Sequence, residues 1–371
     1  MGMGMGMVAE TRCMRAAGEE KLRVSGIFVD FLAHWMDGGT FPDSRWCNQL
    51  SEELSDEGRL AAAMGSLRLE RLLLDGDARL ALERAREWFQ VLTTEDKGLL
   101  RSFHDRVRFM VVVGAPRNGG SYLTAELFSA LGYQAPRVPV AIAHDGFPDA
   151  QPFSLKGGAN SWMDCLRMVG EYLTAVELFF LGSSVAAPVV VPKKATKAIY
   201  AGRLFREVFG RTAHYIVTVR HPIASCISTY EKSGGLPVDG KFCVRSTLES
   251  WIRRDIFCSG VSPGVLAEMD YFEAYVRYWE RFHVNLAMSE LLAHRSYTIV
   301  PYGRDSMEAI ANSFHTRFES DHNPTHFESH TRLDGRHPQW IGRALEALDR
   351  VESAWQIAGL CLPRSKLAEC A

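Results

Sequence analysis

The sequence predicts an α/β protein, in which a doubly wound parallel sheet follows a mostly helical N-terminal extension. Two observations support this fold class. From residue 108 onward, short apolar runs alternate with segments of helical periodicity, which is the pattern of strands and crossover helices in a parallel sheet. Before residue 108 the chain is rich in strong helix formers and shows no such alternation. We therefore expect one region over residues 1–107 and a second over 108–371.

The N-terminal region is predicted to begin with a disordered segment and to continue as helices. Disorder is expected over residues 1 to about 20, of which Met1–Arg12 alternate Met and Gly and then turn polar. Helical spacing of apolar residues, or enrichment in Ala, Leu, Arg and Glu, predicts three helices: Gly26–Trp35, Glu57–Leu74 and Asp77–Phe89. Ser55 with Asp56, and the run Thr93–Asp96, are predicted to cap helices that follow them.

The second region is predicted to contain four strands. Short apolar runs of the kind found in buried parallel strands occur at Phe109–Val113, Val189–Val191, His214–Val219 and Thr298–Val300. Helices are expected at Tyr122–Leu131, at about Tyr200–Phe209 and after Arg220. In such sheets ligands bind at the carboxyl ends of the strands, so the turns that follow the strands are where we expect function.

Composition excludes several classes of protein. The chain has 371 residues, 47% of them hydrophobic, and a net charge of −2, which argues against a nucleic-acid binder because such proteins usually carry a basic excess. Eight cysteines form no Cys-x-x-Cys pair and are expected to be free thiols in a reducing compartment. The N-terminus lacks a continuous apolar segment, and polar residues, glycine and proline interrupt Thr174–Pro192. We expect a soluble, cytoplasmic protein without a membrane partner.

The first functional turn is Gly114–Ser121, which follows a predicted strand and opens a predicted helix. Glycines allow the backbone N–H groups to approach an anion, and the helix N-terminus adds a favourable dipole. The spacing fits the Walker A pattern, but Gly120 occupies the position of its lysine. A cation is present three residues earlier, at Arg117. A plain Gly-rich turn without a ligand remains the alternative.

The second functional turn lies within Tyr215–Tyr230, where again a strand runs into a turn and a helix. Arg220 lies at the strand end, and Pro222 suits the first turn of a helix. Ser225 and Ser228 are three residues apart and so lie near one face of that helix. An arginine, a hydroxyl and a helix N-terminus make a second anion site, and two such sites suit a ligand with phosphates at both ends.

These motifs resemble the sulfotransferase family that uses 3′-phosphoadenosine-5′-phosphosulfate (PAPS), a family with a P-loop-like fold. Gly114–Ser121 is similar to its 5′-phosphosulfate loop, although Asn118 and Gly120 depart from the usual Ser and Thr. Val217–Tyr230 is similar to its 3′-phosphate motif, in which a serine follows an arginine by eight residues, as Ser228 follows Arg220. Val191–Thr196 and Val300–Asp305 resemble two further segments of the family. The resemblance covers roughly residues 108–340.

The resemblance implies a role for each matching residue. PAPS would be the donor, a small-molecule hydroxyl or amine the acceptor, and no metal would be required. Arg117 and Lys194 would be catalytic, because negative charge builds on the leaving phosphate during sulfuryl transfer. The residues implied in donor binding are Arg117, Asn118, Gly119, Gly120, Ser121, Tyr122, Arg220, Ser228, Tyr302 and Arg332.

Transfer also requires a general base, which takes the proton of the acceptor, and the sequence defines this residue less well. Cytosolic members of the family place a histidine two residues after the lysine of the middle strand, and here that position holds Thr196. Other members use a residue that follows the first helix. His144 is the best candidate by position, Asp145 is second, and an ordinary polar loop is the alternative for both.

Three further alternatives stay open at this point. The chain could be a nucleotide-binding protein without catalysis, or a P-loop kinase with an altered Walker A. His322, His326 and His330 recur every four residues, but Pro324 disfavours the regular helix on which they would chelate a metal. Aromatic residues between the motifs are predicted to be mostly core, with some lining an acceptor pocket: Trp162, Phe179, Phe180, Trp251, Phe257, Tyr271, Phe272 and Trp279.

Overall fold

The computed structural model describes residues 11–15, 21–36, 74–94, 97–133, 140–145, 148, 158–182, 188–330 and 337–369. It divides into two compact units. The first joins Met1–Arg108 with Gly132–Asp149 and Ala159–Val191, and the second contains Phe109–Leu131, Ala150–Gly158 and Pro192–Ala371. Among the described residues, no helix combines the length and apolar composition needed to cross a bilayer.

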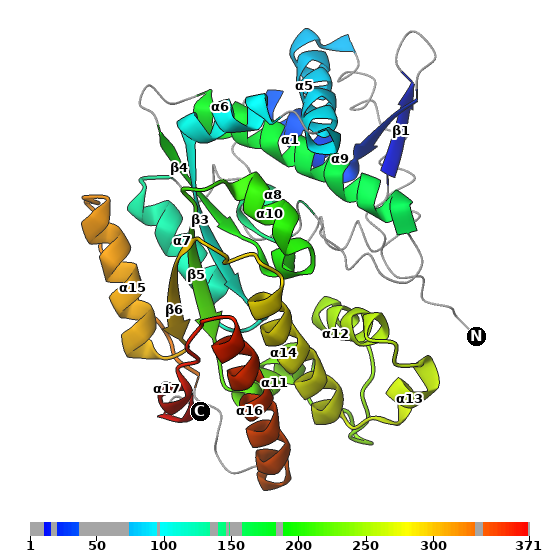
Figure 1. Cartoon of the computed structure of the whole chain (residues 1–371), viewed down its shortest axis with the longest axis vertical. Coiled ribbons are helices and arrows are strands. Elements are labelled where there is room, and N and C mark those ends of the chain that lie inside the picture. The colour runs from blue at the N-terminus through cyan, green and yellow to red at the C-terminus, as the bar shows by residue number, and fades with distance from the viewer. Residues whose placement is uncertain are drawn as a thin grey trace. The chain divides into compact units, whose positions relative to one another are not determined.

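The described residues of the first unit form a strand pair and several helices (Figure 1). Strands β1 (Thr11–Arg15) and β2 (Lys21–Ser25) pair antiparallel. The helices are α1 (Gly26–Met36), α5 (Gly76–Thr93), α6 (Gly98–Arg106), α8 (Val140–Ala143), α9 (Gly158–Val176) and the π-helical turn η2 (Glu177–Leu181).

Two of the helices predicted for this unit are confirmed, and part of the predicted disordered segment is a strand. The expected helices near Gly26–Trp35 and Asp77–Phe89 are confirmed by α1 and α5. Disorder was expected for residues 1–20, but Thr11–Arg15 forms β1 because its backbone pairs with β2. The expected helix Glu57–Leu74 and its cap at Ser55 and Asp56 lie outside the described residues, Leu74 aside.

The caps of this unit differ from those expected. The side chain of Asp75, before α5, accepts from the backbone N–H groups of Asp77 and Ala78 over 2.8 and 3.1 Å. Helix α6 begins after Lys97 without a side-chain cap bond. Thr93 and Thr94 instead end α5, while Glu95 and Asp96 lie outside the described residues.

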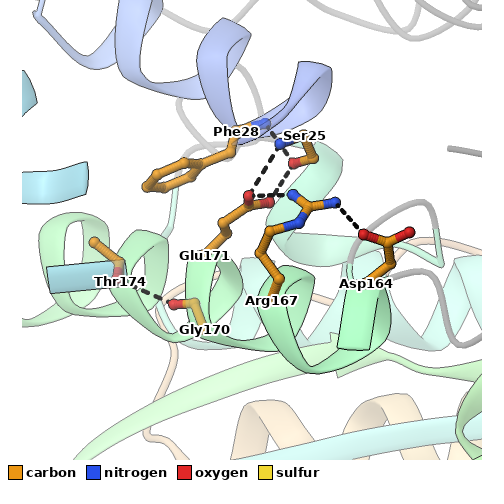
Figure 2. A network of polar contacts seen from close by, with 7 residues as sticks. All are labelled: Ser25, Phe28, Asp164, Arg167, Gly170, Glu171 and Thr174. Atoms are coloured by element: carbon orange, nitrogen blue, oxygen red, sulfur yellow. Dashed lines mark hydrogen bonds and ion pairs between the residues drawn. The ribbon is translucent and has the colours of Figure 1, made fainter. Parts of the chain in front are cut away.

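A buried carboxylate connects α1 to α9 (Figure 2). Glu171 accepts from the backbone N–H of Ser25 over 2.9 Å, from the Ser25 hydroxyl, and from Arg167 over 2.6 Å. The Ser25 hydroxyl oxygen also accepts from the backbone N–H of Phe28 in the first turn of α1. Burial raises the pKa of Glu171, while Arg167 and Ser25 act in the opposite direction. The network fixes where α1 begins relative to α9.

Helix α5 packs against α9 at a close crossing within the same unit. Its buried side chains recur at helical spacing and form one face: Ala78, Ala81, Leu82, Ala85, Trp88 and Leu92. A Cβ at Gly170 of α9 would lie 2.7 Å from the Ala85 carbonyl oxygen, so only glycine permits this approach. Glu177 accepts from Arg84 and from the Trp88 indole, which fixes the end of α9 to α5.

The second unit holds most of a four-stranded parallel sheet, so the chain has an α/β fold. The strands are β3 (Val107–Gly114), β4 (Val189–Lys194), β5 (His214–Val219) and β6 (Ser296–Pro301). They lie in the order β4-β3-β5-β6, and β5 pairs parallel with both β3 and β6. All four predicted strands are confirmed: β5 has the predicted bounds, and the other three are each three residues longer than predicted.

Helices of the second unit gather into two groups around this sheet. Helix α7 (Gly120–Ala130) packs against α15 (Arg304–Arg317). Helices α11 (Pro222–Lys232), α14 (Tyr271–Met288) and α16 (Ile341–Ile357) pack together. In Figure 1 α15 and α14 appear on opposite sides of β5 and β6. The remaining elements are η3 (Thr196–Ala201), α10 (Gly202–Phe209), α12 (Thr247–Cys258), α13 (Pro263–Glu268), η4 (Pro338–Trp340) and α17 (Arg364–Glu369).

Candidate anion-binding site

The strand order locates the candidate site. In chain order the strands lie 2-1-3-4, so the direction of winding reverses between β3 and β5. Ligands of open α/β sheets bind in the crevice outside the carboxyl ends of strands at such a reversal. The two turns singled out in the sequence follow β3 and β5, which are neighbours in the sheet. Residues 103 positions apart, such as Arg117 and Arg220, are thereby brought together.

The turn after β3 has the backbone shape of an anion-binding nest. Arg117 has φ 70° and Gly119 has φ 83°, so two left-handed residues flank Asn118. Alternation of this kind turns successive N–H groups toward one point. Gly119 also lacks room for a side chain, because a Cβ there would lie 2.6 Å from Met307 Cε. Helix α7 begins at Gly120 and adds its N-terminal dipole to the nest.

Lys194, at the end of β4, approaches the first residue of α7. A Cβ at Gly120 would lie 3.2 Å from Lys194 Cε and 3.5 Å from Val112 Cγ1. The lysine stem therefore occupies the space beside position 120, where the Walker A pattern has its own lysine. A cation is thus supplied to this turn from a neighbouring strand.

Arg220 is buried at the centre of the second turn, with 2% of its surface exposed. It donates from Nη1 to the Arg117 carbonyl over 2.9 Å and from Nη2 to the His330 carbonyl over 2.6 Å. The Arg220 guanidinium lies 3.9 Å from the centre of the Tyr302 ring. The Trp279 indole N–H donates to the Arg220 backbone carbonyl over 3.0 Å. Arg220 therefore holds the nest, Tyr302 and the segment that carries His330 in one arrangement.

Helix α11 begins directly after this arginine. Pro222 is its first residue, as predicted, and His221 precedes it as the N-cap. The Nδ1 atom of His221 accepts from the backbone N–H of Ile223 over 3.3 Å. Burial lowers the pKa of His221 to about 4, so the ring stays neutral and can accept at pH 7. Ser228, two turns along this helix, accepts from Arg117 Nε over 3.1 Å.

Three aromatic rings lie beside the nest. Tyr122 and Phe327 have ring centres 4.7 Å apart, and Phe327 lies 5.3 Å from Tyr302. The Tyr122 hydroxyl donates to the Thr325 carbonyl over 2.8 Å. The Tyr302 hydroxyl accepts from the backbone N–H of His330 over 3.3 Å. Phe327 was missed in the sequence, because the irregular segment that carries it shows no periodicity and no family motif was recognised there.

Two carboxylates hold that segment in place. Glu126 of α7 accepts from the backbone N–H and hydroxyl of Thr325, and also faces His315 Nε2 over 3.1 Å. Glu308 of α15 accepts from the backbone N–H of Phe327 over 3.1 Å and pairs with His326. Nothing in the spacing of the sequence signals these contacts, because each joins residues from different elements.

A buried polar chain runs beneath the nest and was also missed. The Tyr275 hydroxyl donates to Ser225 Oγ over 2.6 Å, and the Ser225 hydroxyl donates to Asn118 Oδ1 over 2.9 Å. All three side chains are buried, Asn118 and Ser225 completely. The Asn118 Nδ2 has no hydrogen-bond partner within the described part of the chain. Only the position of Ser225 on the first turns of a helix was visible in the sequence.

Most of the predicted site residues lie together in the second unit, and the remaining two are not among the described residues of that unit. His144 follows α8 and belongs to the first unit, whereas the nest belongs to the second. Arg332 lies outside the described residues. Thr196, at the usual position of the base, is buried and donates to the Gly114 carbonyl over 3.0 Å, so it supports the turn.

The expected aromatic and metal-ligating residues can also be placed. Phe180, Tyr271, Phe272 and Trp279 are buried in the core, while Trp162 is exposed and Phe179, Trp251 and Phe257 are half-buried. His322, His326 and His330 lie in an irregular segment rather than on a helix. Within the described ranges, no three His, Cys, Asp or Glu side chains gather as they would around a metal ion.

No protein-family model, curated protein or solved structure matches this chain.

Proposed function

We propose that this protein is a sulfotransferase of P-loop-like, doubly wound fold that takes its sulfuryl group from PAPS. The observation that carries the proposal is the meeting of three cations at neighbouring strand ends. Arg117 and Arg220 follow β3 and β5, and the Arg220 guanidinium donates to the Arg117 backbone carbonyl over 2.9 Å, while Lys194 ends β4 beside Gly120. A donor with a 5′-phosphosulfate and a 3′-phosphate needs cations at two nearby positions.

The residues present fit such a donor. The nest of Arg117–Gly119 and the start of α7 would bind the 5′-phosphosulfate, with N–H groups from Asn118, Gly119, Gly120 and Ser121. Arg220 and Ser228 would bind the 3′-phosphate. In the structure Arg220 Nη2 donates to the His330 backbone carbonyl, and Ser228 Oγ accepts from Arg117 Nε. An incoming phosphate oxygen would replace both of these contacts.

The adenine would insert between aromatic rings. Tyr122 and Phe327 lie 4.7 Å apart and are tilted by 52°, so the two rings must separate to hold a base between them. Tyr302 would lie at the edge of the base, since its ring faces Phe327 edge-on and Arg220 lies on its face. Stacking of this kind binds a base by its π-face and dispersion.

PAPS supplies the sulfuryl group and leaves as adenosine 3′,5′-bisphosphate. Lys194 and Arg117 would stabilise the charge that builds on the departing phosphate oxygen. The bond that forms joins sulfur to the acceptor oxygen or nitrogen, the bond that breaks joins sulfur to that phosphate oxygen, and the acceptor proton goes to a base. His144 is our candidate for this base. The acceptor would be a small molecule, in a cytoplasmic setting and without a metal.

Two other functions make different demands on the same site. A kinase would use Lys194 in place of the Walker A lysine and would need ATP with Mg²⁺. A nucleotide-binding protein without catalysis would bind the same ligand and turn nothing over.

Labelled sulfate transfer from PAPS to a panel of phenols, alcohols and amines, in EDTA, tests the proposal. We expect transfer to at least one acceptor, and tighter calorimetric binding of adenosine 3′,5′-bisphosphate than of ADP. Dependence on ATP and Mg²⁺ would support the kinase instead. Tight binding of the bisphosphate with no transfer to any acceptor would support the binding protein.

A further inference from the structure

The buried chain Tyr275–Ser225–Asn118 joins three elements that are far apart in the sequence. Tyr275 belongs to α14, Ser225 to α11, and Asn118 to the turn between β3 and α7. The two hydrogen bonds measure 2.6 and 2.9 Å. None of the three side chains reaches the surface, so the chain is not a solvent-facing network.

The direction of these hydrogen bonds is set by Asn118 Oδ1, which can only accept. Ser225 donates its single proton to that oxygen, so the Ser225 oxygen accepts from the Tyr275 hydroxyl. Burial raises the pKa of Tyr275, which keeps that hydroxyl protonated. The carboxamide of Asn118 is thereby fixed in one orientation.

Asn118 is the residue on which the shape of the nest depends. Its neighbours Arg117 and Gly119 both have positive φ, and for arginine this conformation is unfavourable. Such a conformation persists only where the surroundings over-determine it. Two hydrogen bonds hold these residues of the turn: Arg220 donates to the Arg117 carbonyl, and Ser225 donates to Asn118 Oδ1.

We infer that Tyr275 and Ser225 are positioning residues that keep the Arg117–Gly119 nest in its anion-binding shape through Asn118. They do not touch the anion. Their effect is to remove the cost of ordering the turn when the ligand binds, which is how preorganisation raises affinity. The inference rests on the proposed function for the identity of the ligand, but not for the order of the turn itself.

A matched pair of variants tests this inference. Tyr275→Phe removes the hydroxyl that begins the chain. Tyr271→Phe removes an equally buried hydroxyl from the same helix, one that donates to Glu249 over 2.8 Å and has no bond to the turn. By calorimetry with adenosine 3′,5′-bisphosphate, Tyr275→Phe should weaken binding by about fivefold to tenfold, the loss expected for one buried hydrogen bond. Tyr271→Phe should leave the affinity unchanged.

A double-mutant cycle shows whether the two residues act through one chain. Ser225→Ala should weaken binding at least as much as Tyr275→Phe, and the double variant should be no weaker than Ser225→Ala alone. Additive losses, or equal effects of Tyr275→Phe and Tyr271→Phe on affinity, would overturn the inference.

Amide hydrogen exchange on the ligand-free protein separates this inference from the proposed function. In Tyr275→Phe the amides of residues 117–121 should exchange about tenfold faster than in Tyr271→Phe, because the turn has lost its anchor. If the wild-type protein does not bind the bisphosphate, the proposed function fails and this measurement alone decides the inference. Equal exchange in both variants would refute the positioning role whatever the ligand is.

Discussion

Arg117 donates from Nε to Ser228 Oγ over 3.1 Å, which joins two turns that are 111 residues apart in the chain. The sequence suggested two separate anion sites, one around each residue. In the folded protein the cation of the first contacts the hydroxyl of the second. A doubly phosphorylated ligand would therefore separate a pair that is already formed, and each partner would take its own phosphate.

The first prediction concerns Ser228. Arg220 is a poor target, because its side chain holds two chain carbonyls and its loss would disturb the turn itself. Ser228→Ala should weaken adenosine 3′,5′-bisphosphate binding by about 1.5–3 kcal/mol, the range for a hydrogen bond to a charged group. Calorimetry measures this. Ser233→Ala, at the far end of α11, is the control and should bind normally; an unchanged affinity in Ser228→Ala would remove this residue from the site.

The second prediction concerns the ring that would stack on the adenine of the ligand. Phe327→Ala should weaken adenosine 3′,5′-bisphosphate binding by about 1–3 kcal/mol, the cost of losing one stacked aromatic ring. Phe327→Trp should retain most of the affinity. Inorganic pyrophosphate, which has no base, should bind Phe327→Ala and the wild type alike. If both ligands lose affinity equally, Phe327 supports the phosphate site rather than the adenine.

The third prediction concerns the contact between Gly120 and Lys194. Gly120→Ala places a Cβ 3.2 Å from Lys194 Cε and displaces the lysine. Turnover should fall at least about tenfold, because a charge placed for the transition state is lost. The double variant with Lys194→Met should be no slower than Lys194→Met alone. Gly342→Ala, where the added Cβ meets nothing within 4 Å, is the control; a normal rate in Gly120→Ala would argue against a catalytic Lys194.

The fourth prediction concerns the proton. If His144 is the base, turnover should rise with pH around the ordinary pKa of a histidine, about 6.5. His144→Ala should lower kcat by roughly 10²–10⁴-fold and leave bisphosphate affinity intact. The pH profile of kcat measures both effects. Normal turnover in this variant would direct attention to Asp145.

The fifth prediction concerns stability. His283 is fully buried, neither ring nitrogen has a partner among the described residues, and burial lowers its pKa to about 3. Between pH 6.5 and 3 the unfolded state therefore binds the proton and the folded state does not, so stability falls as pH falls through this range. His283→Phe should reduce this loss. Urea unfolding at pH 7.5 and pH 4.5 tests it, and an identical pH dependence in the variant would contradict the assignment.

Much of the fold followed from local patterns. The runs at Phe109–Val113 and His214–Val219 became β3 and β5, because a strand buried on both faces of a parallel sheet is predominantly apolar. Pro222 marked the start of α11, because proline suits only the first turn of a helix. The pairing of β1 with β2 was missed, since β1 (TRCMR) shows no alternation and the alternation in β2 (KLRVS) involves only two apolar residues, Leu22 and Val24.

The sequence by itself determined which residue types stand at the strand ends: Gly114–Ser121 after one strand, and Arg220 with Ser228 after another. Only the tertiary structure decided what these residues contact. The order β4-β3-β5-β6 makes β3 and β5 neighbours, so that Arg220 reaches Arg117, and Ser225 with Tyr275 reaches Asn118. It also places Phe327 between Tyr122 and Tyr302. Hydrogen bonds and ring contacts between distant segments depend on the packing of whole elements, and the spacing of residues within one segment carries no record of that packing.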